Sequence, residues 1–589
     1  MINKYKGVLV YFELVLLYSF IFILIFGYNN FDIHYTDWCL VEYKHTNPLD
    51  INENYLNFFA FLNDSAPIPY CDSILYPFKC SLFYIDYIPI IAILIKIFHK
   101  YIIHSSELIN IQYAWWFGVF SFILQGLVSY KIIKKITNTN ILNATLCSIF
   151  FIIAPPLLLR FPFHFALSAQ FIILISFFPF IYTFSKKQLL MFYFGISILC
   201  CGITPVFVPF ICINFFAYII YKLIKKQEII FNLALIPVFL IGIYLSLLCY
   251  GAFNTDLYFN GYGWGHFSAN LNTFFNPVNI YELFSSKLFP FLNKLKLYSF
   301  QQNEGFAYLG GGIIVLLLLS FIILIKNIKS IIPFIKKYKV EILIFLIVYC
   351  TILFLAVSTT ITLGDKKVIE FNLPQKIVKI ASVFRSSGRY IWENFYLVYL
   401  LIFIFLIKNI SNKKVTFILS LCLILQIYDL FPAFSVLHNE YTKKTTYKNE
   451  LNTNENWNKV TKDRKNIIMF DYFPFFNLDI NEWAIRNHYN SNNLQVSRDL
   501  DYNKFYNFLF ERYNNPKEED IYVFYPEDIE YINTETKLQN CYSVTNKYIA
   551  CTQQPIEGLI GLQAEISTNK DETHNYRNYK YLMEESKLR

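Results

Sequence analysis

Charge is scarce in this sequence. Asp, Glu, Lys and Arg make up 16% of the 589 residues, whereas 55% are hydrophobic and the mean hydropathy is +0.38. These values exclude a soluble protein of this length and indicate an integral membrane protein. The net charge of +9 does not indicate a nucleic-acid partner, because the basic residues lie at the ends of apolar runs, where they face lipid headgroups.

Several motifs are also absent. The sequence has no phosphate-binding loop, no glycine fingerprint of a dinucleotide-binding fold and no HExxH, so ATP-driven transport and zinc proteolysis have no support. It has no CxxC pair, and the spacing of its 12 cysteines fits no zinc site. No metal ligand set is therefore predicted, and the need for a divalent cation such as Mg²⁺ or Mn²⁺ stays open.

Apolar runs recur through the first 433 residues. A helix needs about 20 apolar residues to cross a bilayer. By this measure the sequence predicts about eleven spans, at roughly 8–27, 109–132, 141–158, 165–184, 188–202, 204–222, 229–251, 307–326, 340–360, 391–408 and 415–433.

The apolar segment 82–98 is treated differently. It contains Asp86 and Pro89 and runs into Lys96, His99 and Lys100. We therefore predict an amphipathic helix at the outer membrane interface. An ordinary span is the alternative, and it would invert every later loop.

Lysines cluster before the first run and after every second run, for example at 131–135, 222–226 and 408–414. Cytoplasmic loops carry the excess of Lys and Arg, so the N-terminus is predicted to be cytoplasmic. The prediction is a transmembrane domain over 1–433 in a bacterial cytoplasmic membrane, with a long first outer loop (28–108) and a middle outer loop (252–306).

The chain after the last run is polar. The segments 466–476 and 520–526 have the pattern of buried strands, and 504–513 that of a helix between them. They predict a small extracytoplasmic α/β domain over 434–560, followed by a polar tail, 561–589, that is expected to be poorly ordered.

Two cysteines of this domain, Cys541 and Cys551, flank a turn-like TNK with strand-like residues on both sides. The pattern predicts a disulfide that closes a hairpin, which fits an oxidising compartment. In the first loop, two of Cys39, Cys71 and Cys80 could form one disulfide, which would leave the third as a free thiol.

Candidate chemical groups gather in the outer segments. Acidic residues of the first loop could act as a general base or hold a cation, although a solvated acidic loop has the same composition. Arg160 and His164 lie between two spans, where Arg either binds a phosphate or only reaches the headgroups. Arg385 and Arg389 are four residues apart before a span, and Glu393 is placed to pair with Arg389.

The middle loop is rich in Gly, Asn and aromatic residues. Aromatic faces beside amide groups are typical of a sugar-binding groove, but interfacial aromatic belts have the same composition. The candidate residues for an acceptor or sugar groove are Trp264, His266, Asn270, Glu304 and Tyr308.

Four stretches, in this order, carry a family resemblance: IQYAWWFGVFSFILQG, APPLLLRFPFHFALSAQ, EGFAYLGGG and FRSSGRYIW. They resemble a bacterial multi-span membrane family known as a domain of unknown function, whose architecture is similar to the GT-C class of membrane glycosyltransferases. GT-C enzymes use a polyprenyl-phosphate-linked sugar and carry an acidic catalytic residue in a long first outer loop. The resemblance thus implies a GT-C-like helical membrane protein.

The resemblance also assigns roles. Asp86, in YPFKCSLFYIDYIP, takes the place of an Asp of the family, and Asp50 falls at the distance of a second acid, with Asp37 as its rival. Asp50 or Asp37 would then be the base and Asp86 a second acid. Arg160, His164, Arg385 and Arg389 would bind the lipid phosphate. Arg160 and His164 depart slightly from the family, which has one residue fewer between them.

The sequence thus predicts a GT-C-like glycosyltransferase that moves a sugar from a polyprenyl-phosphate donor to a glycan or lipid acceptor at the outer face. A transporter or flippase of lipid-linked saccharides is the first alternative, and charged residues deep within spans would favour it. A non-catalytic assembly protein is the second, and it would scatter its outer carboxylates away from the arginines.

Overall fold

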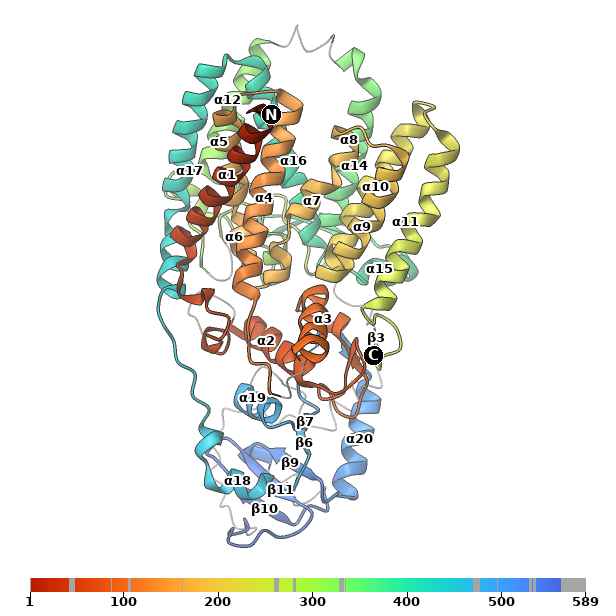
Figure 1. The fold of residues 1–589 in the computed structure, drawn as a ribbon, viewed down its shortest axis with the longest axis vertical. Coiled ribbons are helices and arrows are strands. Elements are labelled where there is room, and N and C mark those ends of the chain that lie inside the picture. The colour runs from red at the N-terminus through yellow and green to blue at the C-terminus, as the bar shows by residue number, and fades with distance from the viewer. Residues whose placement is uncertain are drawn as a thin grey trace. The chain divides into compact units, whose positions relative to one another are not determined.

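The computed structural model divides into two compact units. It describes residues 2–41, 48–85, 87–103, 107–161, 163–258, 264–278, 282–327, 333, 335–469, 477–494, 496–528, 532 and 536–562. Unit 1 comprises 1–51, 111–248 and 260–446, and unit 2 comprises 52–110, 249–259 and 447–589 (Figure 1). Each unit therefore combines segments that are far apart in the sequence.

Unit 1 is built mostly of helices. Its longer helices are α1 (Ile2–Phe26), α4 (Ala114–Thr137), α5 (Ile141–Ile152), α9 (Lys186–Ile203), α10 (Val208–Ile224), α11 (Ile229–Cys249), α12 (Gly311–Lys326), α14 (Lys339–Val357), α16 (Ile391–Asn409) and α17 (Asn412–Tyr441). The shorter ones are α6 (Pro155–Arg160), α7 (Phe171–Ser176), α8 (Phe178–Ile181) and α15 (Gln375–Ser382), and helix α2 (Pro48–Asn63) begins in this unit. A hairpin of β4 (Thr360–Leu363) and β5 (Lys366–Glu370) precedes α15.

All eleven predicted runs coincide with apolar helices of the described chain. Eight of these helices are long and apolar enough to cross a membrane, by length and composition. The other three, Ile141–Ile152, Phe165–Ile181 and Gly311–Lys326, are shorter. The protein is therefore a mostly helical integral membrane protein, and the count of eleven spans stays a prediction.

Helix α1 shows how these helices use their two faces. Tyr18 and Phe22 are buried against the bundle, whereas Phe12, Leu16 and Phe20 are exposed. Apolar residues thus cover both faces, and the residues on the outer face recur every four positions. A helix in water would carry polar residues there, so the outer face is suited to lipid.

The glycines of EGFAYLGGG allow α12 to begin against α17. A Cβ on Gly312 would lie 2.1 Å from the carbonyl oxygen of Cys422, so only glycine permits this approach. Asp429 of α17 accepts hydrogen bonds from the amide of Gly311 (2.7 Å) and the hydroxyl of Tyr308 (2.8 Å). The buried carboxylate thereby satisfies the start of α12.

Unit 2 contains a mixed sheet in the order β10–β11–β9–β6–β7. Strand β6 pairs in parallel with β9 and β7, whereas β11 pairs antiparallel with β9 and β10. The strands are β6 (Asn466–Met469), β7 (Asn490–Ser491), β9 (Asp520–Phe524), β10 (Asn540–Ser543) and β11 (Ile549–Thr552), and the helices are α18 (Glu455–Thr461), α19 (Leu478–Arg486) and α20 (Tyr502–Asn514). The strands and helix expected from the sequence are thus present, except that 470–476 lies outside the described residues.

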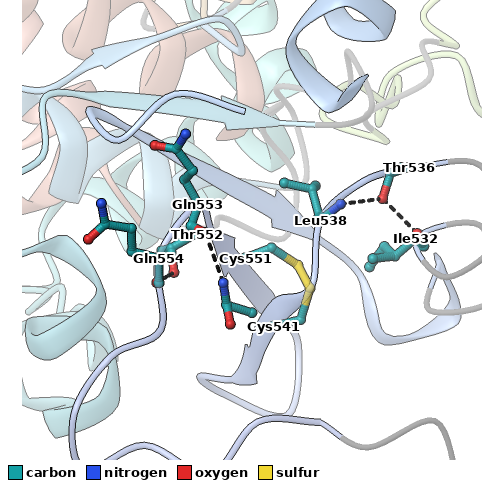
Figure 2. Close-up of a disulfide and its surroundings, with 9 residues drawn as sticks. Ile532, Thr536, Leu538, Cys541, Cys551, Thr552, Gln553 and Gln554 are labelled. Atoms are coloured by element: carbon teal, nitrogen blue, oxygen red, sulfur yellow. Dashed lines mark hydrogen bonds between the residues drawn. A yellow bond between two sulfur atoms is a disulfide. The ribbon is translucent and has the colours of Figure 1, made fainter. Parts of the chain in front are cut away.

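Strand β10 is joined to β11 by a disulfide. Cys541 and Cys551 are opposite each other in the antiparallel register, and their Cα atoms are 4.0 Å apart. Figure 2 shows the bond crossing the hairpin beside Thr552 and Gln553. The predicted tail lies outside the described residues from 563 onward.

Part of the first outer loop belongs to unit 2. The short strands β1 (Tyr70–Cys71) and β2 (Cys80–Ser81) pair with each other, and β3 (Leu257–Tyr258) pairs with β8 (Asp499–Leu500). Ile74 bridges to Ser491. The unit is therefore closed by backbone pairing between three segments, which the linear division into 1–433 and 434–560 does not include.

Within 82–98 the structure has a helix, α3 (Pro89–Phe98), that begins at its proline. With the π-helical segment His99–Ile103 that follows directly, the helical stretch spans at most about 22 Å, which is shorter than a bilayer core of about 30 Å. An interfacial position remains the prediction. Asp86 lies outside the described residues.

Candidate functional site

Arg160 ends the short helix α6. The helix starts at Pro155 and Pro156, which suit the first helical turn, and it stops at Arg160 because the next residue, Phe161, is extended before Pro162. The Arg160 side chain is 3% exposed. Its guanidinium lies over the ring of Trp392, 5.4 Å from the ring centroid.

Glu304 joins Arg160 to Arg389. Its Oε2 lies 2.9 Å from Nη2 of Arg160 and 2.6 Å from Nε of Arg389. Its backbone oxygen also accepts from Nη2 of Arg160 at 3.3 Å. Two guanidinium groups thus share one carboxylate, which leaves an excess of one positive charge. We refer to these three residues as the Arg–Glu–Arg cluster.

Two glycines bring the parts of this cluster together. Gly305 follows Glu304, and Gly388 precedes Arg389 in the 3₁₀ turn Ser387–Tyr390. A Cβ on Gly388 would lie 2.8 Å from the amide nitrogen of Gly305 and 2.8 Å from the carbonyl oxygen of Phe267. The motifs EGF and SSGRY therefore pack backbone to backbone, which places the carboxylate beside the second arginine.

The cluster stabilises the ionised carboxylate. Burial alone would raise the pKa of Glu304, but Arg160, Arg389 and the nearby His164 outweigh it and hold that pKa well below its usual range. The buried Nε of Arg160 has no hydrogen-bond partner among the described residues. This donor and the excess positive charge together suit an anionic ligand.

Asp50 and His164 form a second pair beside the cluster. Their Oδ2 and Nε2 atoms are 3.2 Å apart, and both side chains are nearly buried, with 19% and 18% exposed. The backbone amide of His164 donates to the carbonyl of Arg160 at 3.0 Å, so His164 and the first arginine are held in one turn of chain, and Asp50 joins them through its contact with His164. The structure therefore brings together Asp50, His164, Arg160, Glu304 and Arg389.

The other predicted site residues lie apart or serve the fold. Asp37 is half-buried at the start of a 3₁₀ turn, and none of its described contacts reaches the cluster. Arg385 is exposed, with its guanidinium over the ring of Phe267 at 5.7 Å. Asp86 lies outside the described residues, so its role remains a prediction.

The residues predicted to form a sugar groove separate into different environments. Tyr308 is fully buried against Asp429, and Asn270 is buried between Gln302 and the backbone of Gly364. Trp264 is buried, whereas His266 is exposed. Tyr308 and Asn270 therefore hold the middle loop together, and Glu304 belongs to the Arg–Glu–Arg cluster.

Two acidic residues differ from the prediction: one has another partner than expected, and the other was not named. Glu393 was expected to pair with Arg389, but it is fully buried and accepts from Nδ2 of Asn214 at 2.7 Å, while Arg389 takes Glu304. Asp429 was not considered, although an acidic residue within a predicted span was a signal for a built polar contact. Within the described residues, no group of three or more His, Cys, Asp or Glu side chains is placed to hold a metal ion.

Fold and cluster together define an integral membrane protein with a charged site built from segments between its apolar helices. The sequence matches the model of one protein family, a domain of unknown function (DUF6311), over residues 15–431. The match covers most of the chain, so the protein belongs to this family, and the resemblance to such a family is confirmed.

Two solved structures are similar to this chain. The apo oligosaccharyltransferase of Archaeoglobus fulgidus has 11% identity, with 95% of this chain and 75% of that chain covered and a TM-score of 0.39. ArnT from Cupriavidus metallidurans, bound to undecaprenyl phosphate, has 10% identity, with 93% and 98% covered and a TM-score of 0.34. TM-scores this low support no argument about fold or function. No curated protein matches the sequence.

Proposed function

We propose that this protein is a GT-C-like glycosyltransferase that moves a sugar from a polyprenyl-phosphate donor to a glycan or lipid acceptor at the outer face of a bacterial cytoplasmic membrane. The observation that supports it is the placement of the Asp50–His164 pair beside the Arg–Glu–Arg cluster. The Asp50–His164 pair can take a proton, and the Arg–Glu–Arg cluster carries an excess positive charge that can bind a phosphate.

The chemistry follows from these charges. The acceptor hydroxyl loses its proton to Asp50, which His164 orients, and its oxygen bonds to the anomeric carbon of the sugar. The bond from that carbon to the phosphate oxygen breaks, and its electron pair leaves with the lipid phosphate. Arg160 and Arg389 stabilise the charge that grows on this phosphate, which favours the transition state over the ground state.

The test is a transfer assay with the purified full-length protein in nanodiscs and labelled polyprenyl-phosphate sugars. Wild type should release one polyprenyl phosphate for each sugar transferred. Asp50→Asn should lower the rate by about 10²-fold or more, and Arg389→Ala by a similar factor. Asp32→Asn is the matched control, because Asp32 is an exposed carboxylate of the same outer loop and should not change the rate.

Each negative result has a distinct meaning. Equal rates in wild type, Asp50→Asn and Arg389→Ala would reject the site, and no transfer from any polyprenyl-phosphate donor would reject the reaction. Thermal unfolding of each variant separates lost chemistry from lost folding.

A transporter of lipid-linked saccharides is the second candidate. Glu393 in α16 and Asp429 in α17 are fully buried acidic residues within candidate spans, which favours transport. Both, however, accept hydrogen bonds from neighbouring side chains or helix ends, as structural carboxylates do. Movement of an intact labelled lipid-linked sugar across proteoliposomes, without transfer, would support this candidate.

A scaffold without catalysis is less well supported. Its outer carboxylates would lie away from the arginines, whereas Glu304 contacts both arginines of the cluster.

A further inference from the structure

The segment between α14 and α16 exposes its apolar side chains. After Val357 the chain forms the β4–β5 hairpin and α15 before it enters the turn at Ser387. Six large apolar side chains in this stretch are between 41% and 74% exposed: Leu363, Val368, Ile369, Phe371, Ile377 and Ile380. Exposed apolar groups at this density indicate a surface that something else covers.

Helix α15 leaves one apolar side exposed. Ile377 and Ile380 share one face, and Ile380 is 74% exposed. Ser382, which lies on the opposite face, is 5% exposed. Val378 and Ala381 are half-buried on the side that meets the protein, whereas the side with Ile377 and Ile380 has no cover among the described residues of unit 1.

Lysines accompany this apolar surface. Lys366, Lys376 and Lys379 are exposed, and Lys367 pairs with Glu370 at 2.5 Å. Over 360–384 four lysines stand against Asp365 and Glu370, an excess of two positive charges. The surface thus combines apolar and basic groups, which complements an anionic lipid headgroup above acyl chains.

We propose that residues 358–384 form a membrane-surface element that binds anionic lipid. The segment joins α14 and α16, which are both candidate spans, so its two ends meet the same face of the membrane. Ile377 and Ile380 enter the boundary between headgroups and acyl chains, and the lysines hold the phosphates of the headgroups. A protein partner would instead require the apolar face to stay out of reach of lipid.

This position has a consequence for the site. Arg385 and Arg389 follow α15 directly in the chain. Lysines that gather anionic lipid would therefore supply a lipid phosphate next to the Arg–Glu–Arg cluster. This consequence rests on the proposed function, but the lipid contact itself does not.

The first experiment measures where Ile380 lies. A fluorescent non-natural amino acid replaces Ile380 in the full-length protein, which is placed in phosphatidylcholine nanodiscs with or without phosphatidylglycerol. Lipids with a nitroxide near the headgroup should quench it, and iodide in water should not. The same label at Lys462, an exposed residue of the polar C-terminal segment, should show the reverse.

The second experiment tests the lysines. Quenching of the label at 380 by nitroxide-labelled phosphatidylglycerol is compared with that by labelled phosphatidylcholine. Lys376→Glu with Lys379→Glu should reduce this preference by about 25-fold or more, because each of the two lysines at an anionic surface is worth about fivefold. Lys413→Glu with Lys414→Glu is the matched control, since both are exposed lysines in the first turn of α17.

Three results would overturn the proposal. Quenching by iodide alone would place α15 in water, and quenching by neither agent would bury it against protein. An unchanged lipid preference in the Lys376/Lys379 variant would remove the anionic lipid as its ligand. If sugar transfer fails while lipid quenching at 380 holds, the proposed function fails and this surface element stands.

Discussion

Glu304 carries one negative charge between two arginines that are themselves nearly buried. Without this carboxylate, two guanidinium groups would face each other in a poorly solvated place. Removing one partner of a buried ion pair costs more than the pair itself contributes, because the remaining charge stays buried. The cluster is therefore sensitive to a change of a single atom.

Glu304→Gln should lower the free energy of unfolding by roughly 3 kcal/mol at neutral pH, since the amide keeps the shape and loses the charge. The pKa of Glu304 is lowered in the fold, so its contribution is fully present above the unfolded value of about 4.3 and is lost as the pH falls towards the folded value. The difference between wild type and variant should therefore shrink below pH 4. Thermal unfolding in detergent at several pH values measures it.

Glu370→Gln serves as the control. Glu370 pairs with Lys367 on the surface with both side chains about half exposed, so this change should cost less than about 0.5 kcal/mol. A loss in Glu304→Gln no larger than in this control would contradict the role given to the cluster.

Gly388→Ala tests the backbone contact that positions Arg389. The new Cβ would meet the backbone of Gly305, which cannot move as a side-chain end can, so we expect a loss of about 2 kcal/mol or more. Gly195→Ala in α9 is the control. The new Cβ would have no atom within 4 Å, so the free energy of unfolding should stay the same or rise slightly. The melting temperatures of the two variants measure this difference. Equal values would show that the close contact between Gly388 and Gly305 is not required.

Among the secondary structure elements, those defined by hydropathy were the most predictable. All eleven apolar runs became helices, because a membrane leaves unpaired backbone groups no other partner. The strands β6 and β9 were also predictable, since their residues are apolar on both faces, as expected for buried parallel strands. The hairpin β4–β5 and helix α15 were not, because their apolar residues are too few for a span and face outward.

The β10–β11 hairpin depends on its disulfide. Cys551→Ser should lower the stability of the hairpin by about 2–3 kcal/mol, because the bond closes a short loop in the unfolded chain. Hydrogen exchange of 540–552, followed by mass spectrometry, should speed up in this variant. Cys249→Ser, at an exposed free cysteine, is the control, and equal exchange in both would mean that the bond adds nothing to the hairpin.

At the scale of the whole molecule, hydropathy along the sequence predicted two consecutive domains, 1–433 and 434–560. The structure has two units, and the second collects 52–110, 249–259 and 447–589. Hydropathy does not encode such pairing, because the bridge from Ile74 to Ser491 uses backbone groups that every residue has. The same applies to the site. Arg160 and Arg389 were recognisable from their position beside spans, and Asp50 from the family resemblance. The choice of Glu304 as the partner of both arginines depended on the packing of Gly305 on Gly388.

The orientation in the membrane remains the prediction on which the function depends. The lysine clusters place 222–226 in the cytoplasm and the middle loop with Glu304 outside. Two reporter proteins can test this orientation. Alkaline phosphatase becomes active only outside the cytoplasm, and green fluorescent protein exported in the unfolded state stays dark.

Green fluorescent protein fused after residue 226 should therefore be fluorescent, and alkaline phosphatase fused there should be inactive. The same fusions after residue 305 should behave in the opposite way. The two sites are separated by one candidate span, α11, so they must report opposite sides. If both fusions reported the same side, α11 would not cross the membrane. If both reported the inverse pattern, Asp50, His164 and the Arg–Glu–Arg cluster would face the cytoplasm, and transfer at the outer face would be excluded.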